Sequence, residues 1–257
     1  MLKRAIFGAI YVAVLLLSIL IFPIFFPYVM ILFCGVCLYE FGEMHQMKFQ
    51  LIAGMICLSL AVLATNANFS FVTMPPERFI KIPYLVILAS ILLITFNHKN
   101  LVQKIGTMLF GVLYITVPFY LALNFINQGN IFIWFFVFFM VNDTFAYLTG
   151  MKFGKHKLAP DISPKKTIEG FVGGLVFTLI TGGLLQYYFP QPNFNWMIVA
   201  VIASVFGTLG DLVESKIKRE ADVKDSSNFI PGHGGFLDRL DSFIFALPFI
   251  YLYIETY

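Results

Sequence analysis

Long apolar runs broken by short polar segments constrain this chain more than any other feature of its sequence. Hydrophobic residues make up 59% of the 257 residues and charged residues only 12%, against about 25% charged in an average soluble domain. One soluble core could not bury so much apolar surface. The sequence therefore predicts an all-α fold, a polytopic integral membrane helical bundle of about nine transmembrane helices.

The apolar runs locate these nine spans, since a helix needs about 20 apolar residues to cross a bilayer. We expect them at 5–22, 24–41, 50–64, 82–96, 106–126, 130–149, 168–188, 195–213 and 241–256. The first is interpreted as an uncleaved span, because no convincing cleavage site follows it. We divide the chain into N-terminal transmembrane helices, 1–130, and a C-terminal transmembrane region, 131–257, with polar loops at 150–167 and 214–240.

Lysine and arginine are distributed unevenly between the two sides of such a bundle. Nine spans place only Arg78 and Lys81 on the side away from the N-terminus. By the positive-inside rule, the N-terminus and both polar loops are therefore expected to face the cytoplasm. The basic residues on that side are Lys3, Arg4, Lys48, Lys99, Lys104, Lys152, Lys155, Lys157, Lys165, Lys166, Lys216, Lys218, Arg219, Lys224 and Arg239.

The three cysteines, Cys34, Cys37 and Cys57, all lie within apolar runs. Cys34 and Cys37 have CxxC spacing, but no histidine or second cysteine pair lies near them in the sequence. We interpret them as residues of helix packing rather than as a metal or redox site.

Asn142 and Asp143 lie near the cytoplasmic end of the sixth expected span. An aspartate at membrane depth costs about 2.5–3.5 kcal/mol on insertion scales, so it is usually paired and functional. The pair is therefore a candidate for a site. The alternative is a buried aspartate that is hydrogen-bonded for helix packing.

The loop 150–167 holds five lysines and ends in Ser163-Pro164-Lys165-Lys166-Thr167. Lysines attract an anionic leaflet at roughly 1 kcal/mol each, which accounts for the charge. It does not account for the order of residues before the seventh span. Thr167 could cap that helix, and the helix N-terminus with Lys165 and Lys166 could bind phosphate.

The eighth span ends in a polar helix face. Its members recur at i, i+3, i+4 and i+7: Asp211, Glu214, Ser215 and Lys218. Gly207 and Gly210 leave room for close approach by another helix or by a ligand. The alternative reading is an interfacial ion pair between Lys218 and one of the two acids.

A glycine-rich turn opens the ninth span, with Gly232, Gly234 and Gly235 flanking His233. Asp238 and Asp241 follow at i, i+3. A glycine turn at a helix N-terminus favours anions, yet acidic residues there would repel phosphate unless a cation lay between them. The combination indicates bridging of carboxylate, metal and phosphate, with Mg²⁺ the usual ion.

These motifs together resemble the phosphatidate cytidylyltransferase, or CDP-diacylglycerol synthase, family. The resemblance rests on the order Ser215, Lys218-Arg219, Lys224-Asp225, Pro231, His233-Gly234-Gly235 and Asp238-Arg239-Leu240-Asp241. It is sharp over about 140–245 and general before that.

The resemblance implies a site and a reaction. It implies metal-binding carboxylates at Asp211 and Asp238. The other site residues that we assign, by their motif positions, are Asn142, Asp143, Lys165, Lys166, Glu214, Ser215, Lys218, Arg219, His233, Gly234, Gly235, Arg239 and Asp241. The expected reaction transfers a cytidylyl group from CTP to phosphatidate, with Mg²⁺ as cofactor and room for a second cation.

The expected partners are CTP, phosphatidate and the lipid bilayer, with no nucleic acid; a homodimer is one assembly open to the chain. We expect a multi-pass protein of a bacterial inner membrane, with a catalytic region at 131–257 whose active site faces the cytoplasm. Two alternatives stay open. One is a CTP-dependent enzyme acting on a polyprenol or an ether lipid, and the other is a cation-coupled transporter using Asp143 and Asp211.

Overall fold

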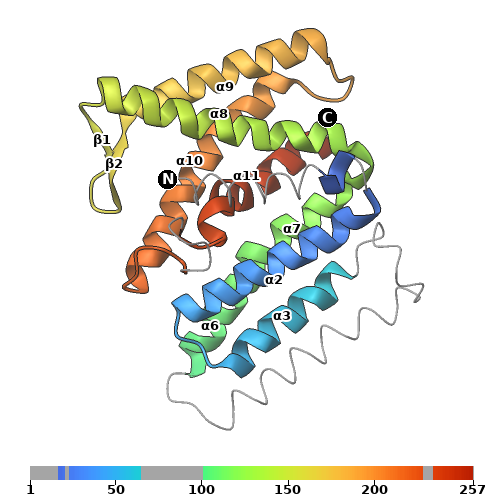
Figure 1. Cartoon of the computed structure of the whole chain (residues 1–257), viewed down its shortest axis with the longest axis vertical. Helices are drawn as coiled ribbons and strands as arrows, with labels where there is room; N and C mark the ends of the chain where they lie inside the picture. Colours follow the sequence, from blue (N-terminus) through green and yellow to red (C-terminus); the bar gives the residue numbers. More distant parts are fainter. Residues whose placement is uncertain (1–16, 21–22, 65–100, 228–233, 257) are drawn as a thin grey trace. The chain divides into compact units, whose positions relative to one another are not determined.

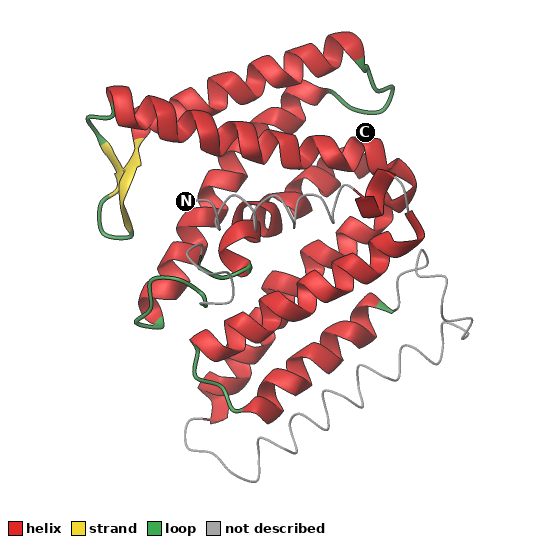
Figure 2. Cartoon of the chain, in the orientation of Figure 1, coloured by secondary structure: helices red, strands yellow, loops and turns green. Residues whose placement is uncertain are grey.

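The computed structural model describes residues 17–20, 23–64, 101–227 and 234–256. Helices dominate these residues, and a single two-stranded hairpin is the only sheet among them (Figure 2). The expected all-α class is confirmed. Of the nine expected spans, 82–96 lies outside the described residues, and 5–22 lies outside them except for 17–20.

The chain divides into two compact units. The first consists of Met1–Gly129 together with Asp225–Asp238, and the second of Asn130–Lys224 together with Arg239–Tyr257. The first unit therefore includes the segment that leads into the last helix.

The described helices of the first unit are α2, α3, α6 and α7, labelled in Figure 1, with shorter helical segments between them. Their bounds are η1 Pro23–Phe25, α2 Phe26–Met44, α3 Phe49–Leu63, α6 Leu101–Gly111, a π-helical segment Val112–Thr116, α7 Val117–Ala122 and a 3₁₀ segment Leu123–Gln128. The π-helical segment ends two residues before Pro118, whose missing N–H cannot continue the α-helical hydrogen bonds.

The second unit is built from four long helices and the hairpin (Figure 1). Their bounds are α8 Gly129–Phe153, β1 Lys157–Ala159, β2 Ser163–Thr167, α9 Ile168–Tyr188, α10 Trp196–Glu220 and α11 Leu237–Thr256. The two strands are antiparallel, with Lys157 opposite Thr167 and Ala159 opposite Ser163.

Five helices within the described residues are long and apolar enough to cross a membrane. They are Phe26–Met44, Lys104–Phe125, Ile131–Phe153, Ile168–Tyr188 and Trp196–Glu220. They correspond to the expected spans 24–41, 106–126, 130–149, 168–188 and 195–213. The expected span 50–64 is the shorter helix α3, and 241–256 lies in α11, whose first turn is charged. The predicted count of nine is therefore not confirmed.

Both polar loops are shorter than their sequence bounds. Helix α8 continues to Phe153 before Gly154, so the expected loop 150–167 begins later and contains the hairpin. Helix α10 continues to Glu220 and α11 begins at Leu237, so both ends of the expected loop 214–240 are helical. Helices α8 and α10 both continue beyond their apolar runs. Polar residues can extend a helix because their backbone N–H and C=O groups still form hydrogen bonds within it.

In the first unit, close helix contacts are made over glycines. A Cβ placed on Gly42 would lie 2.5 Å from the Ile52 side chain of α3, and one on Gly111 would lie 2.6 Å from the Phe41 ring. Cys34 and Cys37 are buried in α2, and the Cys34 thiol lies 4.0 Å from the Thr116 hydroxyl. Their predicted packing role is confirmed.

In the second unit, glycines of α9 and α10 bring neighbouring helices together. A Cβ on Gly174 would lie 2.8 Å from Asn142 Oδ1 of α8, and one on Gly182 would lie 2.9 Å from the Trp196 carbonyl oxygen of α10. A Cβ on Gly210 would lie 2.8 Å from the Asp241 carbonyl oxygen of α11. The predicted close approach at Gly210 is thus confirmed as a contact between helices.

Candidate active site

Three aspartates from three helices form the acidic part of a cluster in the second unit. They are Asp143 of α8, Asp211 of α10 and Asp241 of α11, and the three carboxylates interact electrostatically with one another. Asp241 is buried, Asp211 is half-buried and Asp143 is exposed. The close approach at Gly210 explains why Asp211 and Asp241 lie near each other, because it joins the two helices beside both residues.

Two cations complete this cluster. Lys166, at the end of the hairpin, makes an ion pair with Asp211 and interacts electrostatically with Asp143 and Asp241. Arg239, in the first turn of α11, interacts with Asp143. We name Asp143, Lys166, Asp211, Arg239 and Asp241 the aspartate cluster. All five were predicted as site residues, and the fold brings them together.

Asn142 joins helices next to this cluster. It is buried; its Oδ1 accepts a 2.6 Å hydrogen bond from the Ser204 hydroxyl, and its Nδ2 lies 3.4 Å from Thr208 Oγ1. Its Nδ2 also lies 3.5 Å from Asp143 Oδ1. Asn142 therefore connects α8 to α10 and directs its amide toward the neighbouring aspartate.

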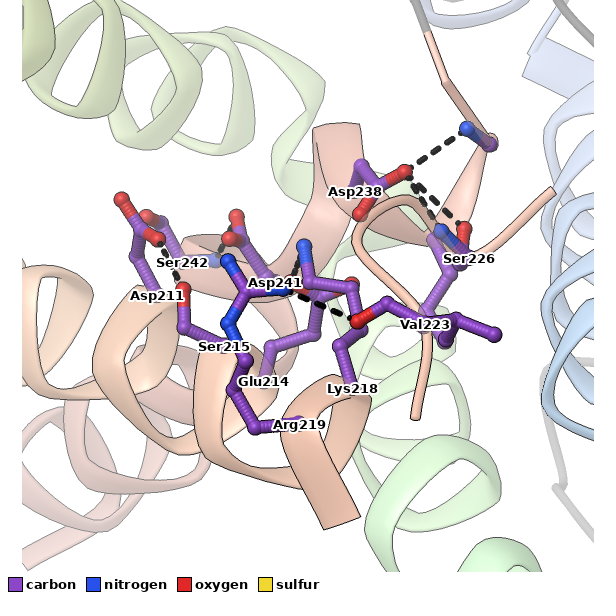
Figure 3. Close-up of polar contacts among 12 residues, drawn as sticks. Asp211, Glu214, Ser215, Lys218, Arg219, Val223, Ser226, Asp238, Asp241 and Ser242 are labelled. Carbon is purple, nitrogen blue, oxygen red and sulfur yellow. Dashed lines mark hydrogen bonds and ion pairs between the residues drawn. The ribbon is translucent and has the colours of Figure 1, made fainter. Parts of the chain in front are cut away.

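The rest of the polar face of α10 is paired mainly within the helix (Figure 3). Glu214 and Lys218 are buried and form an ion pair, which is the alternative that the sequence left open. The Ser215 hydroxyl lies 3.4 Å from Asp211 Oδ1. Arg219 donates a 3.0 Å hydrogen bond to the Val223 carbonyl and so closes the turn after α10.

The hairpin is fixed to the start of α9. Thr167 accepts a 3.1 Å hydrogen bond from Gly170 N, which confirms the predicted cap. Glu169 accepts bonds from Lys155 N at 3.0 Å and from His156 Nδ1 at 2.6 Å. Adjacent strand residues point to opposite faces, and accordingly Lys165 is exposed while its neighbour Lys166 pairs with Asp211.

The start of α11 gives Asp238, which the sequence predicted as a metal ligand, a role in holding the preceding turn. Its Oδ2 accepts three hydrogen bonds, from Gly235 N at 2.7 Å, Ser226 N at 3.0 Å and Ser226 Oγ at 3.1 Å (Figure 3). Gly234 has a φ of +79°, which side-chain-bearing residues rarely adopt. One oxygen of Asp238 is thus occupied in holding the turn. His233 lies outside the described residues.

Sequence reasoning missed Glu40, an acid within the second expected span. Glu40 is only 1% exposed and accepts hydrogen bonds from the segment 226–237 of its own unit. An ionisable residue between Tyr39 and Phe41 in an apolar run was the available signal. Ser204 and Ser226 were also missed, and a lone serine gives no comparable signal.

The donor set of the aspartate cluster fits a hard divalent cation. Its three carboxylates exceed its two cations, and carboxylate oxygen is the protein ligand that Mg²⁺ prefers. Within the described residues, no three His, Cys, Asp or Glu side chains come close enough to hold an ion by themselves. Mg²⁺ usually binds one or two carboxylates together with substrate phosphates. That arrangement does not require three protein side chains close enough to hold the ion by themselves.

The fold and the cluster thus define a polytopic membrane protein with acidic and basic groups gathered from three helices and the hairpin. A model of the cytidylyltransferase family matches residues 2–257. The chain belongs to this family.

Named relatives agree with this assignment. The phosphatidate cytidylyltransferase of Bacillus subtilis (strain 168) is 33% identical over 266 residues, covering 99% of this chain and 98% of the relative. That of Staphylococcus aureus (strain COL) is 40% identical over 225 residues, covering 84% of each. That of Staphylococcus haemolyticus (strain JCSC1435) is 54% identical over 113 residues, covering 43% of each.

Proposed function

We propose that this protein transfers a cytidylyl group from CTP to phosphatidate, giving CDP-diacylglycerol and pyrophosphate. The family and the relatives named phosphatidate cytidylyltransferase support this activity. The single structural observation that supports it most is the aspartate cluster, in which Lys166 and Arg239 accompany the acids of three helices. An enzyme that joins two polyanions needs both kinds of charge.

The proposed reaction is an in-line displacement at phosphorus. A phosphate oxygen of phosphatidate forms a bond to the α-phosphorus of CTP. The bond from that phosphorus to the bridging oxygen of the β-phosphate breaks, and pyrophosphate leaves with the bonding electron pair. A phosphate monoester has a second pKa of about 6, so the attacking oxygen is largely anionic near neutral pH. A strong general base is therefore unnecessary.

The task of the protein is to position two anions against their repulsion. We assign phosphate contacts to Lys166 and Arg239, because both belong to the aspartate cluster. Exposed Lys165 is a further candidate on the same strand. Lys218, Arg219 and His233 stay predicted site residues; Lys218 is already paired with buried Glu214.

We propose Asp211 as the principal Mg²⁺ ligand, with one of Asp143 and Asp241 as a second ligand and the other as a partner of bound water. Bound Mg²⁺ would neutralise phosphate charge and favour departure of pyrophosphate. The assignment of Asp238 as a ligand stays a prediction, and its Oδ2 already accepts three hydrogen bonds that hold the turn. A second cation also stays a prediction.

The proposed site faces the cytoplasm, where CTP is found. The uneven distribution of lysine and arginine supports this orientation, and bacterial relatives support a cell membrane location. Acceptance of a polyprenol or an ether lipid in place of phosphatidate remains the alternative, since it changes the acceptor and not the cluster. A homodimer stays a prediction.

The decisive experiment supplies purified protein in detergent with CTP and phosphatidate, with and without Mg²⁺, and follows pyrophosphate and CDP-diacylglycerol. We expect both products in equal amounts and only with the metal. Parallel reactions with a polyprenyl phosphate and an ether-linked phosphatidate test the acceptor. Folded protein that releases no pyrophosphate with any acceptor would contradict the proposal. Proteoliposomes that take up a cation without CTP would favour a transporter.

A further inference from the structure

Glu40 is a buried acid between Tyr39 and Phe41, near the C-terminal end of α2. Its side chain is 1% exposed. An uncompensated carboxylate at such a position costs several kcal/mol, and such residues are retained mostly where they serve a function. Its hydrogen-bond donors therefore indicate what it does.

Among the residues that the structure describes, four groups donate to Glu40, and all come from the segment before α11 or from the first residue of that helix. Oε1 accepts from Ser227 Oγ at 2.6 Å and from Phe236 N at 2.8 Å. Oε2 accepts from Leu237 N at 2.7 Å and from Ser226 Oγ at 3.2 Å. Since α11 begins at Leu237, two of these donors are N–H groups that have no partner inside the helix. A carboxylate there also interacts favourably with the helix dipole.

The same segment is connected to Asp238 through Ser226. The Ser226 hydroxyl lies 3.2 Å from Glu40 Oε2 and 3.1 Å from Asp238 Oδ2. Gly235 donates to Asp238, and a Cβ on Gly235 would lie 2.5 Å from Glu40 Oε2. The backbone therefore approaches Glu40 as closely as glycine allows. Ser226 therefore connects the two carboxylates within the first unit: its one hydroxyl proton is shared between Glu40 Oε2 and Asp238 Oδ2, and its backbone N–H donates to Asp238 Oδ2 at 3.0 Å.

We propose that Glu40 is a positioning residue for cytidylyl transfer, acting through the N-terminus of α11. It fixes the first backbone N–H groups of that helix and, through Ser226, the carboxylate of Asp238. This inference rests on the proposed function, because Asp238 and Arg239 matter only if the start of α11 contributes to the site. Glu40 itself contacts no reacting group in this proposal.

The central variant is Glu40→Gln. It keeps the shape of the side chain but replaces one carboxylate oxygen, which accepts hydrogen bonds, with an NH₂ group that cannot accept them. The matched control is Glu43→Gln, because Glu43 is an exposed glutamate of the same helix. Purified proteins are compared for kcat per folded molecule, for KM for CTP, and for hydrogen–deuterium exchange of a peptide spanning 234–242.

We expect kcat of Glu40→Gln to fall on the order of 10- to 100-fold, the usual cost of misplacing catalytic groups by about 1 Å. Amides of Phe236 and Leu237 should exchange faster than in the unsubstituted protein. Glu43→Gln should match the unsubstituted protein in both measurements. Ser227→Ala removes a single donor to Glu40 and should lower kcat a few-fold, and it serves as the test if Glu40→Gln does not fold.

Unchanged kcat per folded molecule in Glu40→Gln would overturn the positioning role, even if exchange became faster, because the carboxylate would then be only structural. Unchanged exchange with reduced kcat would also overturn it, since the effect would not pass through the start of α11. If the unsubstituted protein makes no CDP-diacylglycerol at all, the proposed function fails. The exchange comparison then still decides whether Glu40 fixes the start of α11.

Discussion

Asn142 Oδ1 and Ser204 Oγ share a 2.6 Å hydrogen bond between α8 and α10, and both side chains are buried. The bond lies one residue from Asp143, so it fixes the helix that presents this acid. The contact between Asn142 Nδ2 and Thr208 Oγ1 is longer, at 3.4 Å. The two contacts therefore differ in expected strength.

We predict a measurable coupling energy between Asn142 and Ser204. Interhelical hydrogen bonds in membranes contribute about 0.6 kcal/mol on average and up to about 1.7 kcal/mol. A double-mutant cycle of Asn142→Ala with Ser204→Ala, followed by unfolding in mixed detergent, should give a coupling in the upper half of that range. The same cycle with Thr208→Ala is the control and should give less. Equal couplings would contradict the assigned geometry.

Glycine at position 174 should be necessary for the packing of α9 on α8. An added Cβ would lie 2.8 Å from Asn142 Oδ1 and 2.9 Å from its carbonyl oxygen. Overpacking of this kind costs about 1–3 kcal/mol, so Gly174→Ala should lower the free energy of unfolding by that amount. The control is Gly183→Ala in the same helix, where no atom lies within 4 Å. That variant should be neutral or slightly stabilised.

The hairpin should depend on Glu169 for its order. Glu169 accepts bonds from Lys155 N, His156 N and His156 Nδ1, and a glutamine could accept only some of them. Glu169→Gln should therefore speed tryptic cleavage at exposed Lys155 and Lys157 by several-fold. Asp161→Asn, an exposed change in the same hairpin, is the control. A cleavage rate equal to that of the unsubstituted protein would show that Glu169 does not hold the hairpin.

The helical class and the cap at Thr167 could be predicted because each depends on local pattern alone. Apolar runs mark helices, and a threonine before a helix marks its start. The aspartate cluster was predicted through motifs whose residues the fold then brought together, as with Lys166 and Asp211.

The position of Glu40 could not be predicted in the same way. Its donors lie 186 to 197 residues away in the chain, and no local pattern encodes such pairing. The hairpin at 157–167 was missed because its strands are short and lack apolar alternation: β2 reads Ser-Pro-Lys-Lys-Thr. The sequence motifs therefore identified candidate site residues, but they did not show which carboxylate oxygens already accept hydrogen bonds from the protein, as Asp238 Oδ2 does.

The role of Asp211 can be separated from that of Asp238 by their dependence on Mg²⁺. Asp211 makes an ion pair with Lys166 and a long contact with the Ser215 hydroxyl, whereas Asp238 Oδ2 accepts three hydrogen bonds from a turn. We predict that Asp211→Asn lowers turnover more than 100-fold, on the order of the loss of one key electrostatic group. It should also raise the Mg²⁺ concentration needed for half-maximal rate.

Asp238→Asn should behave differently if its main role is the turn. It should lower turnover at every Mg²⁺ concentration without a large shift in the half-maximal concentration, because an uncharged amide oxygen accepts the bonds from Gly235 and Ser226 more weakly than a carboxylate oxygen does. Glu220→Gln is the control, since Glu220 is exposed at the end of the same helix as Asp211 and pairs with Lys216. Full Mg²⁺-dependent turnover in Asp211→Asn would refute the metal assignment. A large Mg²⁺ shift in Asp238→Asn would instead restore Asp238 as a ligand through Oδ1.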